Sequence, residues 1–436
     1  YRDVILPMTV IRRLDAMLEE TKPAVLAMKK QLDAAKIDNQ WPALCNAAGQ
    51  AFCNASPFLL KDLTSRAKAQ TLKADFIAYL DGFSPNVQVI LDKFKFRNQI
   101  DTMVDADILG AVIEKFTSSD INLSPNPIYK DEEQTILKHP CLDNHGMGTI
   151  FEELIRKFNE ENNEEAGEHW TPRDVVELMA DLVFIPIADK IKAASYSCYD
   201  GACGTGGMLT VAQDRLLTLS KRRGKEVAIH LFGQEINPFT MGIAVADTMI
   251  HGGDPDNMQF GDTLNADKFK GYTFDYIISN PPFGIDWKRE AADVEKEHKL
   301  GDAGRFGVGL PQKSDGQMLF LLNGIAKLKD TGRMAIIQNG SSLFTGDAGS
   351  GPSEIRRYII ENDWLDAIVQ LPNDSFYNTG IATYIWIVSK NKPETHRERI
   401  LLIDASKCCE ARRRPIGNKR VDITESCRNL ITQAYS

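Results

Sequence analysis

The sequence lacks features that would place it in several large classes of proteins. No run of apolar residues reaches the roughly eighteen that a membrane-spanning helix needs. The eight cysteines are scattered without a Cys-x-x-Cys pair, and the seven histidines show no metal-ligand spacing beside them. We therefore expect a cytoplasmic protein with reduced thiols, no bound zinc ion and no membrane span.

Positive charge is also in short supply. The chain has 51 Lys and Arg against 60 Asp and Glu, a net charge of −9. Phosphate contacts dominate nucleic-acid binding, so a protein of this charge is poorly suited to hold nucleic acid alone. One stretch is different, because residues 391–420 contain nine Lys or Arg and four Asp or Glu. We expect this stretch, which includes Arg412-Arg413-Arg414, either to touch nucleic acid or to be a solvated tail.

The tetrapeptide Asn280-Pro281-Pro282-Phe283 follows an apolar run, 274–279, that predicts a short buried strand. Ligands bind at the carboxyl ends of strands in open α/β sheets, so this turn is a candidate site. The Asn280 side-chain oxygen and the Pro281 carbonyl can accept from the two N–H bonds of a nucleobase amine and localise its lone pair. Two prolines stiffen the turn, and Phe283 offers a face on which a base can stack. The alternative is a proline-rich turn with one buried aromatic residue.

The first third of the chain has helical periodicity. Apolar residues recur at three- and four-residue steps in 4–18, and similar patterns follow in 71–81 and 87–95. Few residues in this part favour strands, so we predict an all-helical domain over 1–146. The chain begins without methionine inside the first predicted helix, and we expect a segment to precede it.

From residue 196 the pattern alternates between strands and helices, which predicts a parallel sheet covered on both faces. The predicted strands are 197–200, 228–235, 258–260, 275–279, 333–338, 367–371 and 382–388. The last two are joined by about ten residues without a helix, which favours an antiparallel hairpin at the sheet edge. The predicted helices are 208–220, 238–251, 317–328 and 353–362, preceded by one that starts with Thr171 as its cap and Pro172 at its first position. We assign the α/β domain to 147–410 and a basic, helical tail to 411–436.

The ends of four predicted strands carry small or polar residues. One strand runs into the glycine-rich turn 200–207, where a ligand can approach the backbone closely. The next ends at Glu235, whose carboxylate can accept from both ribose hydroxyls, and Asp262, after the third, can accept from an adenine amine. The fourth ends in the tetrapeptide. Singly these are tight turns or helix caps, but in this order they predict a cofactor beside Asn280.

These motifs resemble those of the S-adenosylmethionine-dependent amino-methyltransferases, in particular the adenine-N6 DNA methyltransferases, where a cofactor motif precedes Asn-Pro-Pro-Phe. The resemblance extends to Gly167-Glu168-His169-Trp170-Thr171-Pro172-Arg173, to 150–155 and to the helical front domain. Over essentially its whole length the sequence is similar to the modification subunit of Type I restriction–modification systems. It departs from the family at Gly201, where proline is common, and at His169-Trp170, where a pair of Phe or Tyr residues is usual.

The resemblance implies a fold, a cofactor and a set of site residues. The fold is an S-adenosylmethionine-dependent methyltransferase (Rossmann-like) α/β sheet with an N-terminal all-helical domain. The cofactor is S-adenosylmethionine, and no metal is implied. The residues expected to bind the cofactor are Glu168, His169, Trp170, Thr171, Pro172, Arg173, Asp200, Ala202, Gly204, Thr205, Gly206, Glu235 and Asp262. The expected catalytic residues are Asn280, Pro281, Pro282 and Phe283.

The implied activity is that of a site-specific, adenine-specific DNA methyltransferase, which methylates N6 of a flipped-out adenine as one subunit of a Type I complex. In that family two modification subunits join one specificity subunit, which reads the target, and a restriction subunit can be added. Two alternatives stay open: a protein glutamine N5-methyltransferase, because related enzymes use Asn-Pro-Pro-Tyr, and a catalytically silent scaffold that binds DNA or a partner. The long loop 284–314 is expected to close over DNA or to be a surface insertion.

Overall fold

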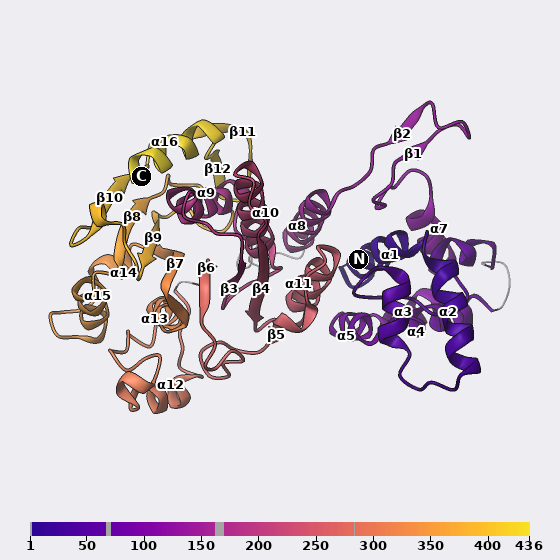
Figure 1. Cartoon of the computed structure of the whole chain (residues 1–436), viewed down its shortest axis with the longest axis horizontal. Coiled ribbons are helices and arrows are strands. Elements are labelled where there is room, and N and C mark those ends of the chain that lie inside the picture. Colours follow the sequence, from indigo (N-terminus) through magenta and orange to yellow (C-terminus); the bar gives the residue numbers. More distant parts are fainter. Residues whose placement is uncertain (1, 67–70, 162–169, 283) are drawn as a thin grey trace. The chain divides into compact units, whose positions relative to one another are not determined.

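The computed structural model describes residues 2–66, 71–161, 170–282 and 284–436, and its contacts divide the chain into two compact units (Figure 1). The helical unit contains residues 1–162 and 238–256, and the sheet unit contains 163–237 and 257–436. This division differs from the sequence-based boundaries at 146 and 410. The helix α8 (Asn144–Glu161) and the helix α11 (Pro238–Ile250) group with the helical unit, and 411–436 folds within the sheet unit.

The helical unit is built around α1 (Arg2–Leu18), whose apolar residues Leu6, Met8, Ile11 and Leu14 are buried. The buried Arg13 guanidinium donates to the carbonyls of residues 123 and 142 and to the side chain of residue 144, which offsets part of its desolvation, while its Nε has no partner among the described residues. The other elements are α2 (Lys22–Ala34), α3 (Trp41–Ala48), η1 (Leu60–Arg66), α4 (Leu72–Asp81), α5 (Pro85–Lys93), α6 (Arg97–Asp105), α7 (Leu109–Thr117), α8, α11 and η3 (Pro255–Asn257).

The prediction that 1–146 is entirely helical is wrong in one detail. Two short strands, β1 (Ile128–Tyr129) and β2 (Leu137–His139), pair in antiparallel fashion. They contain only two and three residues, so an alternating apolar pattern has no length over which to develop.

The sheet unit contains an eight-stranded mixed sheet with the order β10-β8-β9-β7-β6-β3-β4-β5. The strands are β3 (Ser195–Asp200), β4 (Ala228–Glu235), β5 (Met258–Phe260), β6 (Phe274–Ser279), β7 (Leu328–Asn339), β8 (Leu365–Gln370), β9 (Thr383–Ser389) and β10 (Leu401–Asp404). All neighbours are parallel except β9, which is antiparallel to both β7 and β8. The predicted α/β sheet, its strands and the antiparallel hairpin of β8 and β9 are confirmed.

The predicted position of that hairpin is wrong. It does not lie at the sheet edge, because β9 is inserted between β7 and β8, and β10 pairs in parallel outside β8. The sequence analysis missed β10, a four-residue strand in which exposed residues alternate with half-buried ones. Its sequence is nevertheless a short apolar run, Leu401-Leu402-Ile403, which is too short to distinguish a strand from a segment of helix by its pattern.

Helices cover both faces of the sheet (Figure 1). On one side α9 (Arg173–Phe184), α10 (Gly207–Arg222) and α16 (Glu425–Tyr435) pack together, and on the other α12 (Ala291–His298), α13 (Gln317–Lys327) and α15 (Gly351–Glu361) contribute to one apolar core with the strands. The short elements are η2 (Ile185–Ile187), η4 (Gly301–Ala303), α14 (Ser341–Phe344), η5 (Glu394–His396) and a two-stranded ribbon of β11 (Glu410–Ile416) and β12 (Lys419–Asp422). In the described ranges no helix has the length and apolar character to cross a membrane.

The segment 284–314 is not an unstructured loop, because it contains α12 and η4. Arg305 organises it: its guanidinium donates to the carbonyl oxygen of Thr263 at 2.7 Å and pairs with Glu297 of α12 at 2.7 Å. The segment is therefore fixed to the turn that follows β5.

Candidate active site

The carboxyl ends of β3 and β4 are joined by the glycine-rich turn. Glu235 Oε2 accepts from the backbone N–H of Gly204 at 3.0 Å, and its Oε1 accepts from the N–H of Asn237 at 2.8 Å. Gly204 and Gly206 have φ angles of 54° and 83°, a region that residues with a Cβ rarely adopt. The predicted residues Ala202 and Thr205 lie in this turn. The turn therefore holds its backbone N–H groups beside a buried carboxylate.

The ends of β3 and β6 are joined by Asp200, a fully buried residue. Asp200 Oδ1 accepts from the Ser279 hydroxyl at 2.6 Å and from the N–H of Ala202 at 3.0 Å, while Oδ2 is buried without a partner among the described residues. Burial raises the pKa of Asp200 to about 7, against the opposing effect of these two hydrogen bonds. Because Ser279 precedes Asn280, Asp200 also fixes the start of the Asn-Pro-Pro turn.

The Asn280 amide is held by one end only. Its Nδ2 donates to Thr171 Oγ1 at 2.9 Å, and the Thr171 hydroxyl in turn donates to Met208 Sδ at 3.5 Å. The hydroxyl oxygen therefore presents lone pairs to the amide nitrogen, which sets the orientation of the amide. Asn280 Oδ1 is buried and accepts no hydrogen bond from any residue that the structure describes. A strong acceptor is thus fixed at the carboxyl end of β6.

The prediction that Thr171 caps a helix is wrong. The helix α9 begins at Arg173, Pro172 occupies the cap position with ψ of 136°, and the cap has no side-chain hydrogen bond. The residue before a proline is disfavoured in the helical region, so the chain is still extended at Thr171. Because α9 begins only at Arg173, the Thr171 hydroxyl is available to accept the hydrogen bond from Asn280.

An aromatic pair lies next to Thr171 along the chain. The rings of Trp170 and Tyr377 stack with centroids 4.1 Å apart and planes 5° apart. Sequence reasoning included Trp170 but missed Tyr377, which lies in the connection after β8. That position was a usable signal, because β8 ends at the same edge of the sheet as β6.

Further carboxyl groups occupy this edge. Asp262, after β5, accepts from the N–H of Leu264 at 2.8 Å. Burial raises the pKa of Glu290, and the nearby Asp262 adds to the increase. Together with Asp200 and Glu235, these groups make the strand ends acidic, which favours a ligand with positive charge or hydrogen-bond donors.

The remaining predicted site residues are placed as follows. Pro281 is buried and Pro282 half-buried directly after β6, and Arg173 opens α9. Glu168, His169 and Phe283 lie outside the described residues. Within the described ranges no group of three or more His, Cys, Asp or Glu side chains could hold a metal ion.

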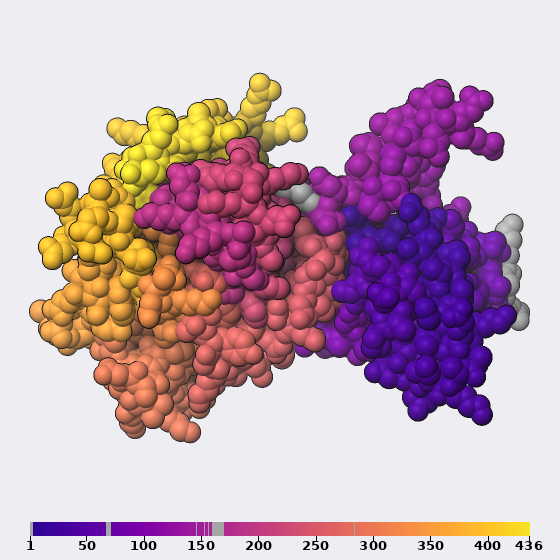
Figure 2. Space-filling model, viewed as in Figure 1, coloured from indigo at the N-terminus to yellow at the C-terminus, as the bar shows by residue number. Residues whose placement is uncertain are grey.

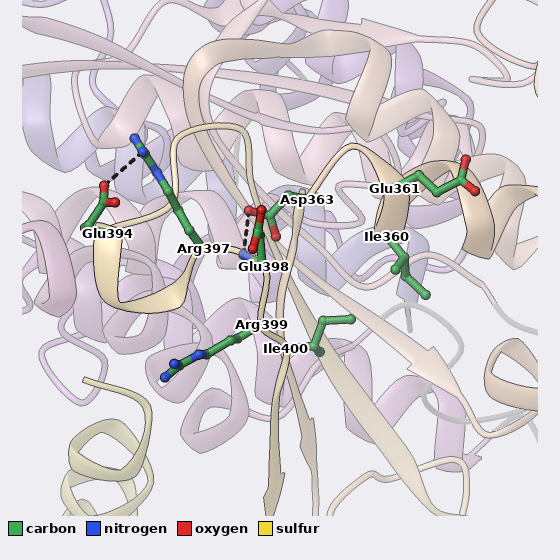
Figure 3. Close-up of a pocket in the computed structure, with 8 residues that line it drawn as sticks. All are labelled: Ile360, Glu361, Asp363, Glu394, Arg397, Glu398, Arg399 and Ile400. Atoms are coloured by element: carbon green, nitrogen blue, oxygen red, sulfur yellow. Dashed lines mark hydrogen bonds and ion pairs between the residues drawn. The ribbon is translucent and has the colours of Figure 1, made fainter.

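A pocket of about 730 Å³ lies elsewhere in the sheet unit (Figure 3). It is formed by the end of α15 and the segment before β10, so it faces the amino ends of β8 and β10, opposite the carboxyl ends where ligands bind in such sheets. Some of its charged side chains already have partners in the protein. Arg397 pairs with Glu394, and Asp363 Oδ2 accepts a hydrogen bond from the backbone N–H of Glu398. Its lining residues are Ile360, Glu361, Asp363, Glu394, Arg397, Glu398, Arg399 and Ile400.

The mixed sheet and the residues at its carboxyl edge define a Rossmann-like methyltransferase fold. Comparison with known families agrees: residues 142–436 match the N-6 DNA Methylase family, and residues 1–116 match the HsdM N-terminal domain. The chain belongs to the N-6 DNA methylase family.

Individual relatives are consistent with this membership. The chain is 29% identical over 260 residues to the Type I restriction enzyme MjaIX methylase subunit of Methanocaldococcus jannaschii, covering 59% of this chain and 44% of the relative. It is 30% identical over 265 residues to the HindI methylase subunit of Haemophilus influenzae, covering 59% and 54%. The chain thus spans about half the length of these curated relatives.

A solved structure supports the fold. The type I restriction-modification system methyltransferase subunit from Streptococcus thermophilus superposes with a TM-score of 0.70 at 21% identity, covering 100% of this chain and 88% of that chain. At this identity the similarity concerns the fold. It covers both the helical unit and the sheet unit.

Proposed function

We propose that this chain transfers a methyl group from S-adenosylmethionine to N6 of an adenine in DNA, as the modification subunit of a Type I restriction–modification complex. The observation that carries the proposal is the Asn280 side chain, whose nitrogen is bound by Thr171 while its buried oxygen has no partner in the described part of the chain. A buried unpaired acceptor costs about 1–3 kcal/mol. Such an atom is explained when a ligand supplies the missing donor.

The exocyclic amine of adenine supplies that donor. Its N–H would donate to Asn280 Oδ1, and the nitrogen lone pair, otherwise delocalised into the ring, would be localised toward an electrophile. Because the amide is neutral and fixed by Thr171, it acts by positioning and polarisation and needs no change of protonation state. The amine of a paired base is inaccessible, so the adenine must leave the duplex.

The strand ends also fit the methyl donor. Gly204 and Gly206 allow close backbone approach, Glu235 and Asp262 can accept from the hydroxyl and amine groups of a nucleoside, and the acidic surroundings favour a cation. When bound, S-adenosylmethionine supplies an electrophilic methyl group. The protein's part is to hold that group and the Asn280 acceptor at the same edge of the sheet.

Partners follow from the same proposal. The net charge of −9 argues that another chain contributes phosphate contacts, and a specificity subunit that reads the target would do so. We propose two modification subunits for each specificity subunit and a restriction subunit as a further partner. The proposed location is the cytoplasm, where the DNA is.

The test is methyl transfer from radiolabelled S-adenosylmethionine to DNA or to extract protein, with and without the specificity subunit. We expect label in N6-methyladenine of DNA only, and only with that subunit present. Asn280→Ala should slow transfer at least about 100-fold while donor affinity stays within about threefold, and the matched control Asn362→Ala, at the exposed end of α15, should not. Label in protein, or equal loss of transfer and donor binding in Asn280→Ala, would contradict the proposal.

A further inference from the structure

The ribbon of β11 and β12 lies at the same edge of the sheet as Asn280. The strand β10 is parallel to β8, with Asp404 opposite Gln370, so the segments that follow both strands leave at the carboxyl edge. The connection after β8 carries Tyr377, and the segment after β10 continues into the ribbon. Figure 2 shows the C-terminal residues, in yellow, on the surface of the sheet unit.

The tip of the ribbon is bound to the connection after β8. The N–H of Asn418 donates to the carbonyl oxygen of Tyr377 at 2.9 Å, and the N–H of Arg420 donates to that of Asp374 at 2.9 Å. Gly417 sits so close that a Cβ there would lie 2.6 Å from the Tyr377 oxygen. The ribbon therefore touches the segment whose tyrosine stacks on Trp170.

A buried ion pair anchors the ribbon to the start of α9. Lys419, 1% exposed, donates to Asp174 Oδ2 at 2.8 Å and to the carbonyl oxygen of Ser375 at 3.1 Å. Asp174 follows Thr171 by three residues, and Thr171 binds Asn280. The ribbon is thus anchored to the folded sheet unit, and the backbone positions of its surface arginines are fixed.

The ribbon concentrates positive charge that the protein does not neutralise. Residues 410–422 contain five basic and two acidic side chains, a net charge of +3 in a chain of −9. Lys419 forms an ion pair with Asp174, and Arg412 forms one with Asp422. Arg413, Arg414 and Arg420 are exposed and form no ion pair with any residue in the described ranges.

We propose that Arg413, Arg414 and Arg420 bind phosphates of the DNA strand that carries the extruded adenine. The proposal rests on the proposed function, since it is the position beside Asn280 that selects DNA over other polyanions. Extrusion of a base moves its flanking phosphates, and arginines on an anchored ribbon can hold those phosphates by charge-assisted hydrogen bonds. Each neutralised phosphate also releases counterions, which gives a measurable salt dependence.

The test compares two triple variants of the full chain. One is Arg413→Ala/Arg414→Ala/Arg420→Ala; the matched control, Arg222→Ala/Arg397→Ala/Arg399→Ala, removes three exposed arginines at the amino edge of the sheet. The probe is a fluorescent DNA duplex with one mismatched adenine, which leaves the stack more readily than a paired base, titrated from low to physiological salt. Each lost phosphate contact should reduce the slope of log affinity against log salt by about 0.9, so the ribbon variant should lose about 2–3 and the control less than 1.

The outcomes separate this proposal from the proposed function. An equal slope in the ribbon variant and the parent, or no DNA binding by the parent at low salt, would overturn the ribbon assignment. Unchanged DNA binding together with lost binding of a specificity subunit would assign the arginines to a protein partner and overturn it as well. Asn280→Ala should keep the parental slope while losing transfer. If Asn280→Ala transferred methyl groups normally, the proposed function would fail although the ribbon result stood.

Discussion

Replacement of Thr171 by valine tests how Asn280 is oriented. Valine has nearly the shape of threonine but cannot accept the hydrogen bond that Asn280 Nδ2 donates at 2.9 Å. An amide N–H left unpaired in a buried position costs about 1–3 kcal/mol, and the amide can recover part of this by rotating, which withdraws Oδ1 from the adenine amine. Since about 1.4 kcal/mol corresponds to a tenfold change in rate, we expect kcat to fall about tenfold to a hundredfold.

The assay is steady-state methyl transfer to a target duplex, with donor affinity measured separately by calorimetry. Thr171→Val should lower kcat while the affinity for S-adenosylmethionine stays within about threefold, because the lost bond serves the amide. Thr171→Ser keeps a hydroxyl and should stay within about threefold of the parent. The double variant Asn280→Ala/Thr171→Val should be no slower than Asn280→Ala alone. Thr171→Val acts only by misplacing Asn280 Oδ1, and Asn280→Ala has already removed that oxygen.

Two results would refute this reasoning. If serine at position 171 were as slow as valine, keeping the hydroxyl would not preserve the rate, and the hydrogen bond to Asn280 alone could not account for the loss in Thr171→Val. If the losses in the double variant multiplied, Thr171 would act independently of Asn280, for instance on the cofactor, as the family resemblance implies. Thermal unfolding of each variant shows whether the sheet unit is intact.

Three other changes probe the same edge of the sheet. Burial raises the pKa of Asp200 to about 7, so the stability that its protonated form contributes is present below about pH 4 and is lost as the pH rises through 7. The melting temperature of Asp200→Asn relative to the parent should therefore rise between about pH 5 and about pH 8. A difference that stays constant with pH would contradict the raised pKa. Lys419→Met leaves Asp174 without its cation and should cost about 2–4 kcal/mol in urea unfolding, partly restored by adding Asp174→Asn; no restoration would argue against the pair. Tyr377→Ala should cost at least about 0.5–1.5 kcal/mol in the same assay by removing the stacking on Trp170, with Tyr377→Phe close to the parent.

Sequence patterns predicted the parts of the fold that have strong apolar signals. The strand β6 is almost entirely buried and was found within one residue of its start. The outer strand β10 was missed although residues 400–403 are all apolar, because so short a run does not distinguish a strand from a helix segment; in the sheet, Leu402 is 77% exposed. In α12 only Val294 is buried. One buried residue gives no apolar periodicity, so the sequence could not distinguish this helix from a charged loop.

The site was predictable as far as topology places residues together. Parallel strands bring Asp200, Glu235 and Asn280 to one edge whatever the details of packing, so their proximity followed from the order of strands. The bond between Asn280 and Thr171 joins residues 109 positions apart and depends on where Pro172 lets α9 begin. No local pattern encodes such a bond. The topology places Tyr377 at the same edge of the sheet, but no local pattern pairs its ring with that of Trp170.

The helix α11 limits how this molecule can be dissected. It is encoded between β4 and β5, yet it packs with α5 and α8 in the helical unit, where Phe94 and Phe239 make an edge contact at 5.2 Å. Eleven of its thirteen residues are buried. A shortened chain starting at residue 163 would keep α11 but strip it of those neighbours, leaving an apolar patch prone to aggregation. Chimeras between homologues should therefore exchange residues 238–256 together with the N-terminal helices.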